Sequence, residues 1–67
     1  MDLQLGDIVW IRHEALLPNY LLGRQAIVSG LRKNGDVRVG VFLGHRPGTQ
    51  MRFRILDVWK EEVELVT

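Results

Sequence analysis

Cysteine is absent from this 67-residue sequence, which excludes disulfide bonds and thiolate metal sites. Long apolar runs are absent too, since no stretch approaches the roughly 18 residues that a membrane-spanning helix needs. The first residues carry neither the basic cluster nor the apolar core of a signal peptide. We therefore expect a soluble, cytoplasmic protein that does not enter a membrane.

Side chains suited to catalysis are scarce. Ser29 is the single serine, and neither histidine lies near it in the sequence. A nucleophile needs a base within reach and a third group to orient that base. His13, Glu14 and His45 do not show the spacing of a metal site. The sequence therefore predicts a protein that is not an enzyme and that holds no cofactor or metal ion.

Charge is distributed unevenly along the chain, although the net charge is only +1. Residues 24–54 contain seven basic side chains and a single acid, Asp36, whereas residues 57–67 contain four acids and only one base, Lys60. Most of the central cations are arginines, which suit phosphate, carboxylate and aromatic partners. The length predicts one domain over residues 1–67, near the lower limit for a self-sufficient hydrophobic core.

Alternation of apolar and polar residues with a period of two dominates the sequence, and no helical periodicity stands out. Asn34-Gly35 between two apolar runs is a strong hairpin signal. A long first loop occupies residues 13–23, and a short turn near residues 57–60 precedes the final strand. The predicted strands are residues 8–12, 24–31, 37–43, 51–56 and 62–66. Such short strands must curl to cover an apolar face, so we predict an all-β, five-stranded barrel.

Two sequence patterns indicate the type of barrel. Residues 6–11 (Gly-Asp-x-Val-x-Ile) and residues 23–28 (Gly-x-x-Ala-x-Val) together resemble the opening of KOW-type and related SH3-like barrels. The end of the sequence, a turn followed by residues 63–66 (Val-Glu-Leu-Val), is similar to the short last strand of such barrels. The resemblance implies a small SH3-like barrel, with Ala26 where the KOW pattern usually has glycine.

The hairpins predict which side chains share a face. A two-residue turn at Asn34-Gly35 places Val28 opposite Val41, and a symmetric loop at 44–50 places Phe42 opposite Arg52. The resulting inner face holds Val28, Val39, Val41, Phe53 and Ile55, with Gly30 at an inward-facing bend. The outer face holds Ile27, Ser29, Arg38, Phe42, Arg52 and Arg54, and Trp10 also points outward.

Arginines beside aromatic rings on this outer face form a first candidate site. Cations bind phosphates and rings stack on bases, so the face suits a nucleic acid. The alternative is that Phe42 and Arg52 form a cross-strand cation–π pair that only stabilises the sheet. The residues of the candidate face are Trp10, Arg38, Phe42, Arg52 and Arg54.

The first loop is the second candidate site because it is unusually apolar. Loops normally run over the surface and are polar. This loop either folds over the barrel mouth and completes a small core, or forms an exposed surface for a partner protein or a second copy. Its apolar residues are Leu16, Leu17, Tyr20, Leu21 and Leu22.

Two kinds of partner follow from these candidates. The small net charge, the presence of only two lysines and the missing motif glycine at Ala26 favour a protein partner. The chain would then be a protein-binding module, an accessory subunit of a larger complex or a self-associating domain. The arginine-rich middle of the chain favours the alternative, a nucleic-acid-binding barrel.

Overall fold

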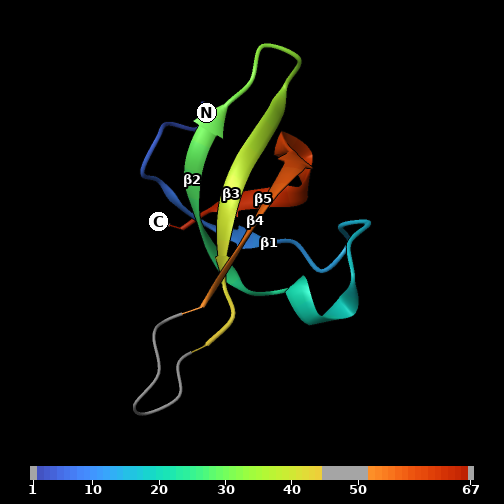
Figure 1. Ribbon diagram of the computed structural model, residues 1–67. Coiled ribbons are helices and arrows are strands. Elements are labelled where there is room, and N and C mark those ends of the chain that lie inside the picture. The colour runs from blue at the N-terminus through green and yellow to red at the C-terminus, as the bar shows by residue number, and fades with distance from the viewer. Residues whose placement is uncertain (1, 45–51, 67) are drawn as a thin grey trace.

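The computed structural model describes residues 2–44 and 52–66. These residues form a single sheet of five antiparallel strands in the order β4-β3-β2-β1-β5 (Figure 1). The strands are β1 (Ile8–Ile11), β2 (Gln25–Leu31), β3 (Asp36–Phe42), β4 (Phe53–Trp59) and β5 (Val63–Leu65). Two 3₁₀ helices, η1 (Asn19–Leu21) and η2 (Lys60–Glu62), lie in the connections. The predicted all-β architecture is confirmed.

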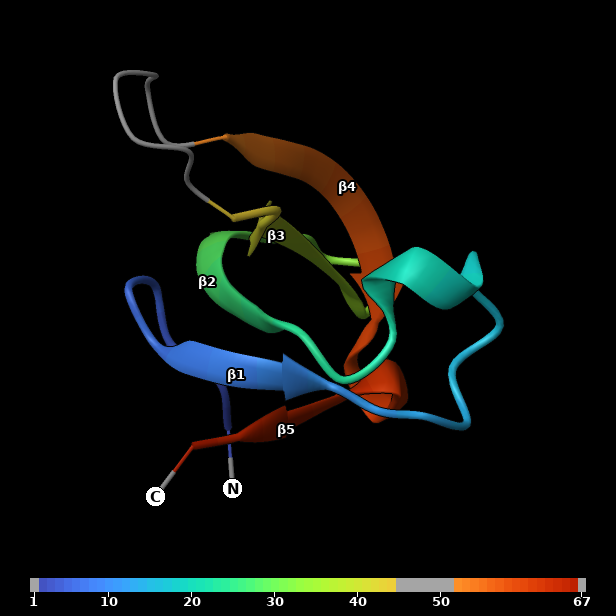
Figure 2. The same cartoon turned by 90° about the horizontal axis from the view of Figure 1, so that it is seen from below.

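The sheet curls strongly but keeps two edges. Strands β1 to β4 follow one another as a meander, and β5 returns to pair with β1, with Val9 opposite Leu65. Figure 2 shows the strands bending round a common interior. β4 and β5 end the sheet on its two sides and are not hydrogen-bonded to each other. The sheet is therefore open where the sequence predicted a closed barrel.

The core lies on the concave side of the sheet and is entirely apolar. Alternation along β1 turns Val9 and Ile11 inward and leaves Ile8 and Trp10 outside, as predicted for Trp10. The 3₁₀ helix η1 adds Leu21 from the first loop. The buried side chains are Val9, Ile11, Leu21, Ala26, Val28, Val37, Val39, Val41, Val58 and Val63.

The turn between β2 and β3 differs from the predicted two-residue turn. The Arg32 N–H donates to the Asp36 carbonyl (3.0 Å), so the loop has three residues and ends on Gly35. Gly35 has a φ of +94°, a left-handed conformation that suits glycine in three-residue hairpin loops. The longer loop moves the register of the hairpin by one residue.

A second shift in the same hairpin restores the predicted face of β2. The register shifts between Val28 and Gly30, which leaves Ser29 without a partner on β3. Val28 then lies opposite Val39 rather than Val41, but all three valines are buried, as predicted. Gly30 lies opposite the exposed Arg38, so the prediction that Gly30 faces inward is wrong.

The register between β3 and β4 reverses the predicted faces of β4. Phe42 lies opposite Phe53, and Arg54 lies opposite the buried Val41. The Leu43 N–H donates to the Arg52 carbonyl, so the connection between this pair runs over residues 44–51. The predicted loop was one residue shorter, and a one-residue slip turns every side chain to the other face. Phe53 and Ile55, predicted in the core, are therefore exposed.

The end of β4 also differs from the prediction. β4 continues to Trp59, and the turn before the last strand is η2. Trp59, the last residue of β4, is exposed. Met51, the predicted first residue of this strand, lies outside the described residues. No helix in the described part of the chain has the length and apolar character needed to cross a membrane.

Candidate interaction surfaces

The convex side of the sheet carries a continuous group of apolar side chains, which we call the outer apolar patch. It crosses four strands in one row, because Ile8 lies opposite Ile27, Ile27 opposite Gly40, and Gly40 opposite Ile55. Ile8, Phe53 and Ile55 remain 36%, 48% and 60% exposed. The members of the patch are Ile8, Ile27, Phe42, Phe53 and Ile55.

Gly40 lies at the centre of the patch and allows its neighbours to meet. A Cβ at this position would lie 3.2 Å from Ile55 Cδ1, 3.6 Å from Ile27 Cγ2 and 3.8 Å from Phe53 Cδ1. The missing side chain is thus replaced by three apolar groups from β2 and β4. The patch is consequently a joined surface rather than separate exposed residues.

An aromatic pair forms one end of the patch. The rings of Phe42 and Phe53 have centroids 4.8 Å apart and planes inclined by 53°. Tilted pairs of this kind stabilise by about 0.5–1.5 kcal/mol beyond the area they bury. Phe53 is nevertheless half exposed, so the pair leaves an aromatic surface accessible.

The other end of the patch is bounded by charge. Arg38 Nε lies 3.0 Å from Asp57 Oδ1, and Arg32 Nη1 lies 3.3 Å from Asp57 Oδ2. The hydrogen bond from Arg38 lowers the pKa of Asp57, and the positive charges of Arg38 and Arg32 act in the same direction. The same hydrogen bond raises the pKa of Arg38. These arginines therefore already have a carboxylate partner.

The arginine and aromatic residues predicted for one face are divided between two. Trp10, Arg38 and Phe42 lie on the convex side, as predicted. Arg54 lies on the side of Val41, and Arg52 shares that side because it is two residues away. Both arginines are exposed because the ends of β3 and β4 project beyond β1 (Figure 1). The partner of Phe42 on β4 is Phe53, not the predicted Arg52.

The first loop divides between core and surface. Leu21 is only 1% exposed, and Leu17 and Leu22 pack against the core. Leu16, in contrast, is 95% exposed, and Tyr20 is half exposed. The interpretation that the loop completes a small core therefore fits Leu17, Leu21 and Leu22, and the exposed surface is reduced to two side chains.

A hollow of about 760 Å³ lies between the first loop and the end of β4. Leu16, Leu17 and Trp59 provide its apolar lining, and Glu14 and Glu61 stand among the charged residues around it. Glu62 joins the two walls, because its carboxylate accepts the backbone N–H groups of Leu16 (3.1 Å) and Trp59 (2.8 Å). These two hydrogen bonds hold the first loop and the end of β4 against η2, the helix that contains Glu62.

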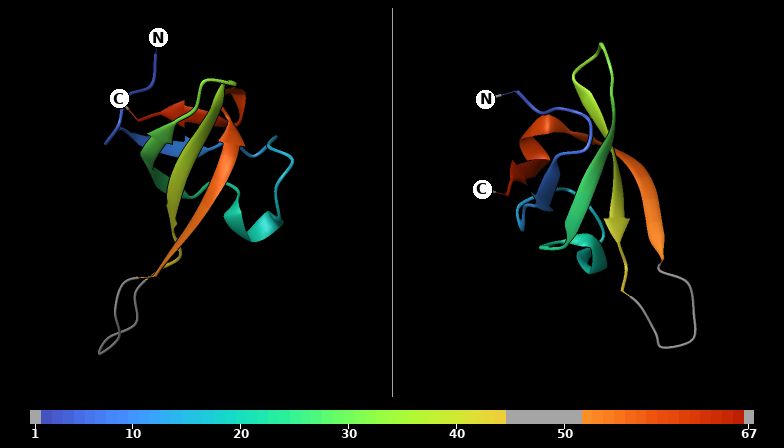
Figure 3. Two further views of the ribbon diagram at one scale, coloured as in Figure 1. Left: turned by 45° about the horizontal axis from the view of Figure 1, so that its top comes forward. Right: turned by 90° about the vertical axis from the view of Figure 1, so that its left-hand side faces the viewer.

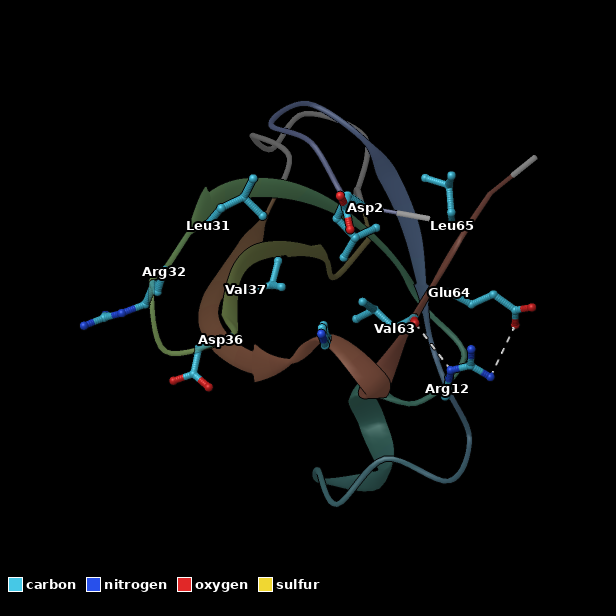
Figure 4. Close-up of a pocket in the computed structure, with 12 residues that line it drawn as sticks. Asp2, Arg12, Leu31, Arg32, Asp36, Val37, Val63, Glu64 and Leu65 are labelled. Carbon is cyan, nitrogen blue, oxygen red and sulfur yellow. Dashed lines mark hydrogen bonds and ion pairs between the residues drawn. The ribbon is translucent and has the colours of Figure 1, made fainter.

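A second hollow, of about 580 Å³, lies beside β5 and the tip of the β2–β3 hairpin (Figure 4). Arg12 on its wall is engaged with the Val63 carbonyl (3.3 Å) and with Glu64 (4.0 Å). Arg32 and Asp36 point away from Val37 and Val63 in Figure 4. Arg32 and Asp36 therefore line only the rim of this hollow.

Metal-ligating residues do not cluster among residues 2–44 and 52–66. His45, one member of the trio considered from the sequence, lies outside the described residues. The chain matches no known protein-family model, no curated protein and no solved structure. The arguments for function therefore come from the geometry of this chain alone.

Proposed function

We propose that this chain is a non-catalytic protein-binding module, an accessory domain that docks a partner protein on its outer apolar patch. Its fold is an SH3-like barrel left open between β4 and β5. The curled sheet and the short turn η2 directly before β5 support this assignment. The observation that carries the proposal is the joined row of apolar side chains from β1, β2 and β4 that meet around Gly40 of β3, with Ile8 and Ile55 exposed.

An exposed apolar group of this kind is unusual on a small monomeric protein. Single exposed apolar residues are common, but contiguous patches mark sites of interaction. Aromatic residues are also enriched where proteins meet, and the Phe42–Phe53 pair supplies them here. The charged cluster of Arg38 and Asp57 lies beside the patch in the place of a polar rim.

A nucleic-acid partner is less well supported by the same geometry. Such a site needs several cations free to meet phosphates, with aromatic rings beside them. Arg32 and Arg38 instead share Asp57, and Arg12 lies beside Glu64. Arg52 and Arg54 lie on the opposite side from the Phe42–Phe53 pair.

The test begins with photo-crosslinking from position 53, where benzoylphenylalanine replaces a half-exposed phenylalanine. A protein captured there is purified and titrated by calorimetry against the wild type, Phe53→Ser and Leu16→Ser. We expect Phe53→Ser to weaken binding by about tenfold or more, because buried aromatic anchors dominate interfaces. Leu16→Ser is the control, since Leu16 is exposed but lies on the first loop. Binding that is unchanged by Phe53→Ser would contradict the proposal.

The nucleic-acid alternative has its own measurement. Trp10 and Trp59 are both exposed, so their fluorescence reports a ligand that binds beside them. Titration with short mixed-sequence RNA and DNA should leave this fluorescence unchanged at low salt. Saturable quenching that weakens at physiological salt, and that Arg52→Glu abolishes, would contradict the proposal of a protein partner and support a nucleic-acid partner.

A further inference from the structure

β4 is a free edge of the sheet. Figure 3 shows β4 at the margin of the sheet in both views, with no strand beyond it. Natural proteins protect such edges with charged side chains, above all lysine, with proline, with bulges or by keeping the strand very short. β4 is seven residues long, pairs with β3 without a bulge and contains neither proline nor lysine, and its charged residues are Arg54 and Asp57 alone. The opposite edge, β5, is only three residues long.

The backbone of β4 has a defined set of unused hydrogen-bonding groups. The Leu43 N–H donates to the Arg52 carbonyl, and bonded residues alternate along an antiparallel strand. Arg54, Leu56 and Val58 therefore direct their backbone groups at β3, whereas Phe53, Ile55 and Asp57 direct theirs away. The Trp59 N–H bonds to Glu62 instead of β3, which agrees with this alternation. Among the described residues, no backbone group bonds to Phe53, Ile55 or Asp57 across the free edge.

We propose that two copies of this chain pair through their β4 edges, antiparallel and about a two-fold axis at Ile55. Ile55 of one copy then lies opposite Ile55 of the other, and Phe53 lies opposite Asp57 in both directions. All of these residues carry the unused backbone groups, so each pair exchanges two hydrogen bonds. The two five-stranded sheets become one continuous sheet.

The side chains of β4 are compatible with this pairing. The strand carries one base, Arg54, and one acid, Asp57, so two copies do not repel each other through net charge. Arg54 lies opposite Leu56 of the other copy, which avoids a direct meeting of two arginines. A two-fold axis at Arg54 would place like charges opposite each other, and that arrangement is destabilising.

The same axis joins the outer apolar patches of the two copies. In one copy the row passes from Ile8 through Ile27 and Gly40 to Ile55. Pairing at Ile55 continues this row into the second copy without interruption. The pairing uses backbone groups and does not depend on the docking of a partner protein.

Hydrogen exchange and sedimentation test the pairing on the wild-type protein. Measurements run from about 10 µM to about 1 mM, because small interfaces associate weakly. We expect a monomer–dimer equilibrium in which the amides of Phe53, Ile55 and Asp57 become protected as concentration rises. The amides of Arg54 and Leu56 should be protected throughout, since they already bond to β3. A monomer at the highest concentration, or a dimer without this alternation, would overturn the inference.

Charge variants at the axis provide the decisive test. Ile55→Lys places two lysines opposite each other and Ile55→Glu places two glutamates opposite each other, so each variant alone should be monomeric. A mixture of the two should form a heterodimer. Ile55 is 60% exposed, and circular dichroism checks that both variants fold. A dimer of either variant alone, or a mixture that stays monomeric, would contradict the placement of the two-fold axis at Ile55.

The same variants separate this inference from partner docking. A partner protein that docks on the outer apolar patch should be lost with Ile55→Lys and with Ile55→Glu, and mixing should not restore it. Failure of the self-pairing leaves docking on one copy intact. Failure of docking leaves the concentration-dependent protection of Phe53, Ile55 and Asp57 intact.

Discussion

The two sides of the sheet are built from the same strands, yet the apolar side chains on the concave side are buried in the core and several on the convex side are exposed. On β3, Val37, Val39 and Val41 are buried on the concave side. On the convex side of the same strand, Phe42 is only partly buried and belongs to the outer apolar patch, and Gly40 carries no side chain. The stability of the fold is thus concentrated on one side, and the other side is free to contact a partner.

The largest expected effect comes from a matched pair of isoleucines on β1. Ile11 faces the core and is 1% exposed, whereas Ile8 faces outward and is 36% exposed. Ile11→Ala should lower the free energy of unfolding by about 2–5 kcal/mol, because it leaves a cavity. Ile8→Ala should lower it by less than about 1 kcal/mol. Chemical denaturation measures both, and equal losses would mean that the convex side is as important for stability as the core.

Glu62 provides the next test, because it fixes the first loop that completes the concave side. Glu62→Ala removes the acceptor for the Leu16 and Trp59 N–H groups and should cost about 1 kcal/mol. Hydrogen exchange should become faster at both amides. The control is Glu61→Ala, because Glu61 is the exposed neighbour and makes neither bond. If Glu61→Ala lowered the free energy of unfolding as much as Glu62→Ala does, the hydrogen bonds from the Leu16 and Trp59 N–H groups would not be the cause of the loss.

Gly40 tests how tightly the convex side is packed. Gly40→Ala should raise the free energy of unfolding by about 0.5 kcal/mol, because glycine within a strand loses more conformational entropy on folding. The new methyl group would meet Ile55 Cδ1, the end of a flexible and exposed side chain that can rotate away. Thermal denaturation measures the change. A loss above about 1 kcal/mol would mean that the outer apolar patch is packed as rigidly as the core.

The smallest effect is expected in acid, at the charged end of the outer apolar patch. The folded protein lowers the pKa of Asp57 below its ordinary value of 3.8, chiefly through the hydrogen bond from Arg38. The contribution to stability is therefore complete above the ordinary pKa and is lost as the pH falls through the lower folded value. The free energies of unfolding of the wild type and of Asp57→Asn, measured between about pH 5 and pH 2, should differ near pH 5 and converge toward pH 2. A wild-type advantage that grows toward pH 2 would contradict this assignment.

The strands could be predicted from the sequence because alternation and the Asn34-Gly35 turn are local signals. The inward positions of Val28, Val39 and Val41 and the outward position of Trp10 were correctly expected from this alternation. The prediction that Val28 of β2 faces the core was also correct, although the three-residue loop and the shift at Ser29 each moved the register between β2 and β3 by one residue. These two shifts have the same direction and together preserve the face.

The candidate site could not be predicted in the same way because it depends on the register of β4. Two alternations overlap in this strand, Phe53 with Ile55 and Leu56 with Val58, and either one could face the core. Only the pairing with β3 decides between them, and this pairing depends on the length of the connecting loop. The apolar character of Phe53 and Ile55 was therefore visible in the sequence, but their exposure was not.

The pairing of β5 with β1 has a consequence for how the chain reaches its native state. Val9 and Leu65 are neighbours in the sheet although nearly the whole chain separates them. Closing so long a segment costs chain entropy before any contact compensates for it, and such non-local topologies fold slowly for their size. During synthesis β1 remains a sheet edge until residues 63–65 have left the ribosome. We therefore expect the β2–β3 hairpin to form early and the union of the first and last strands to set the folding rate.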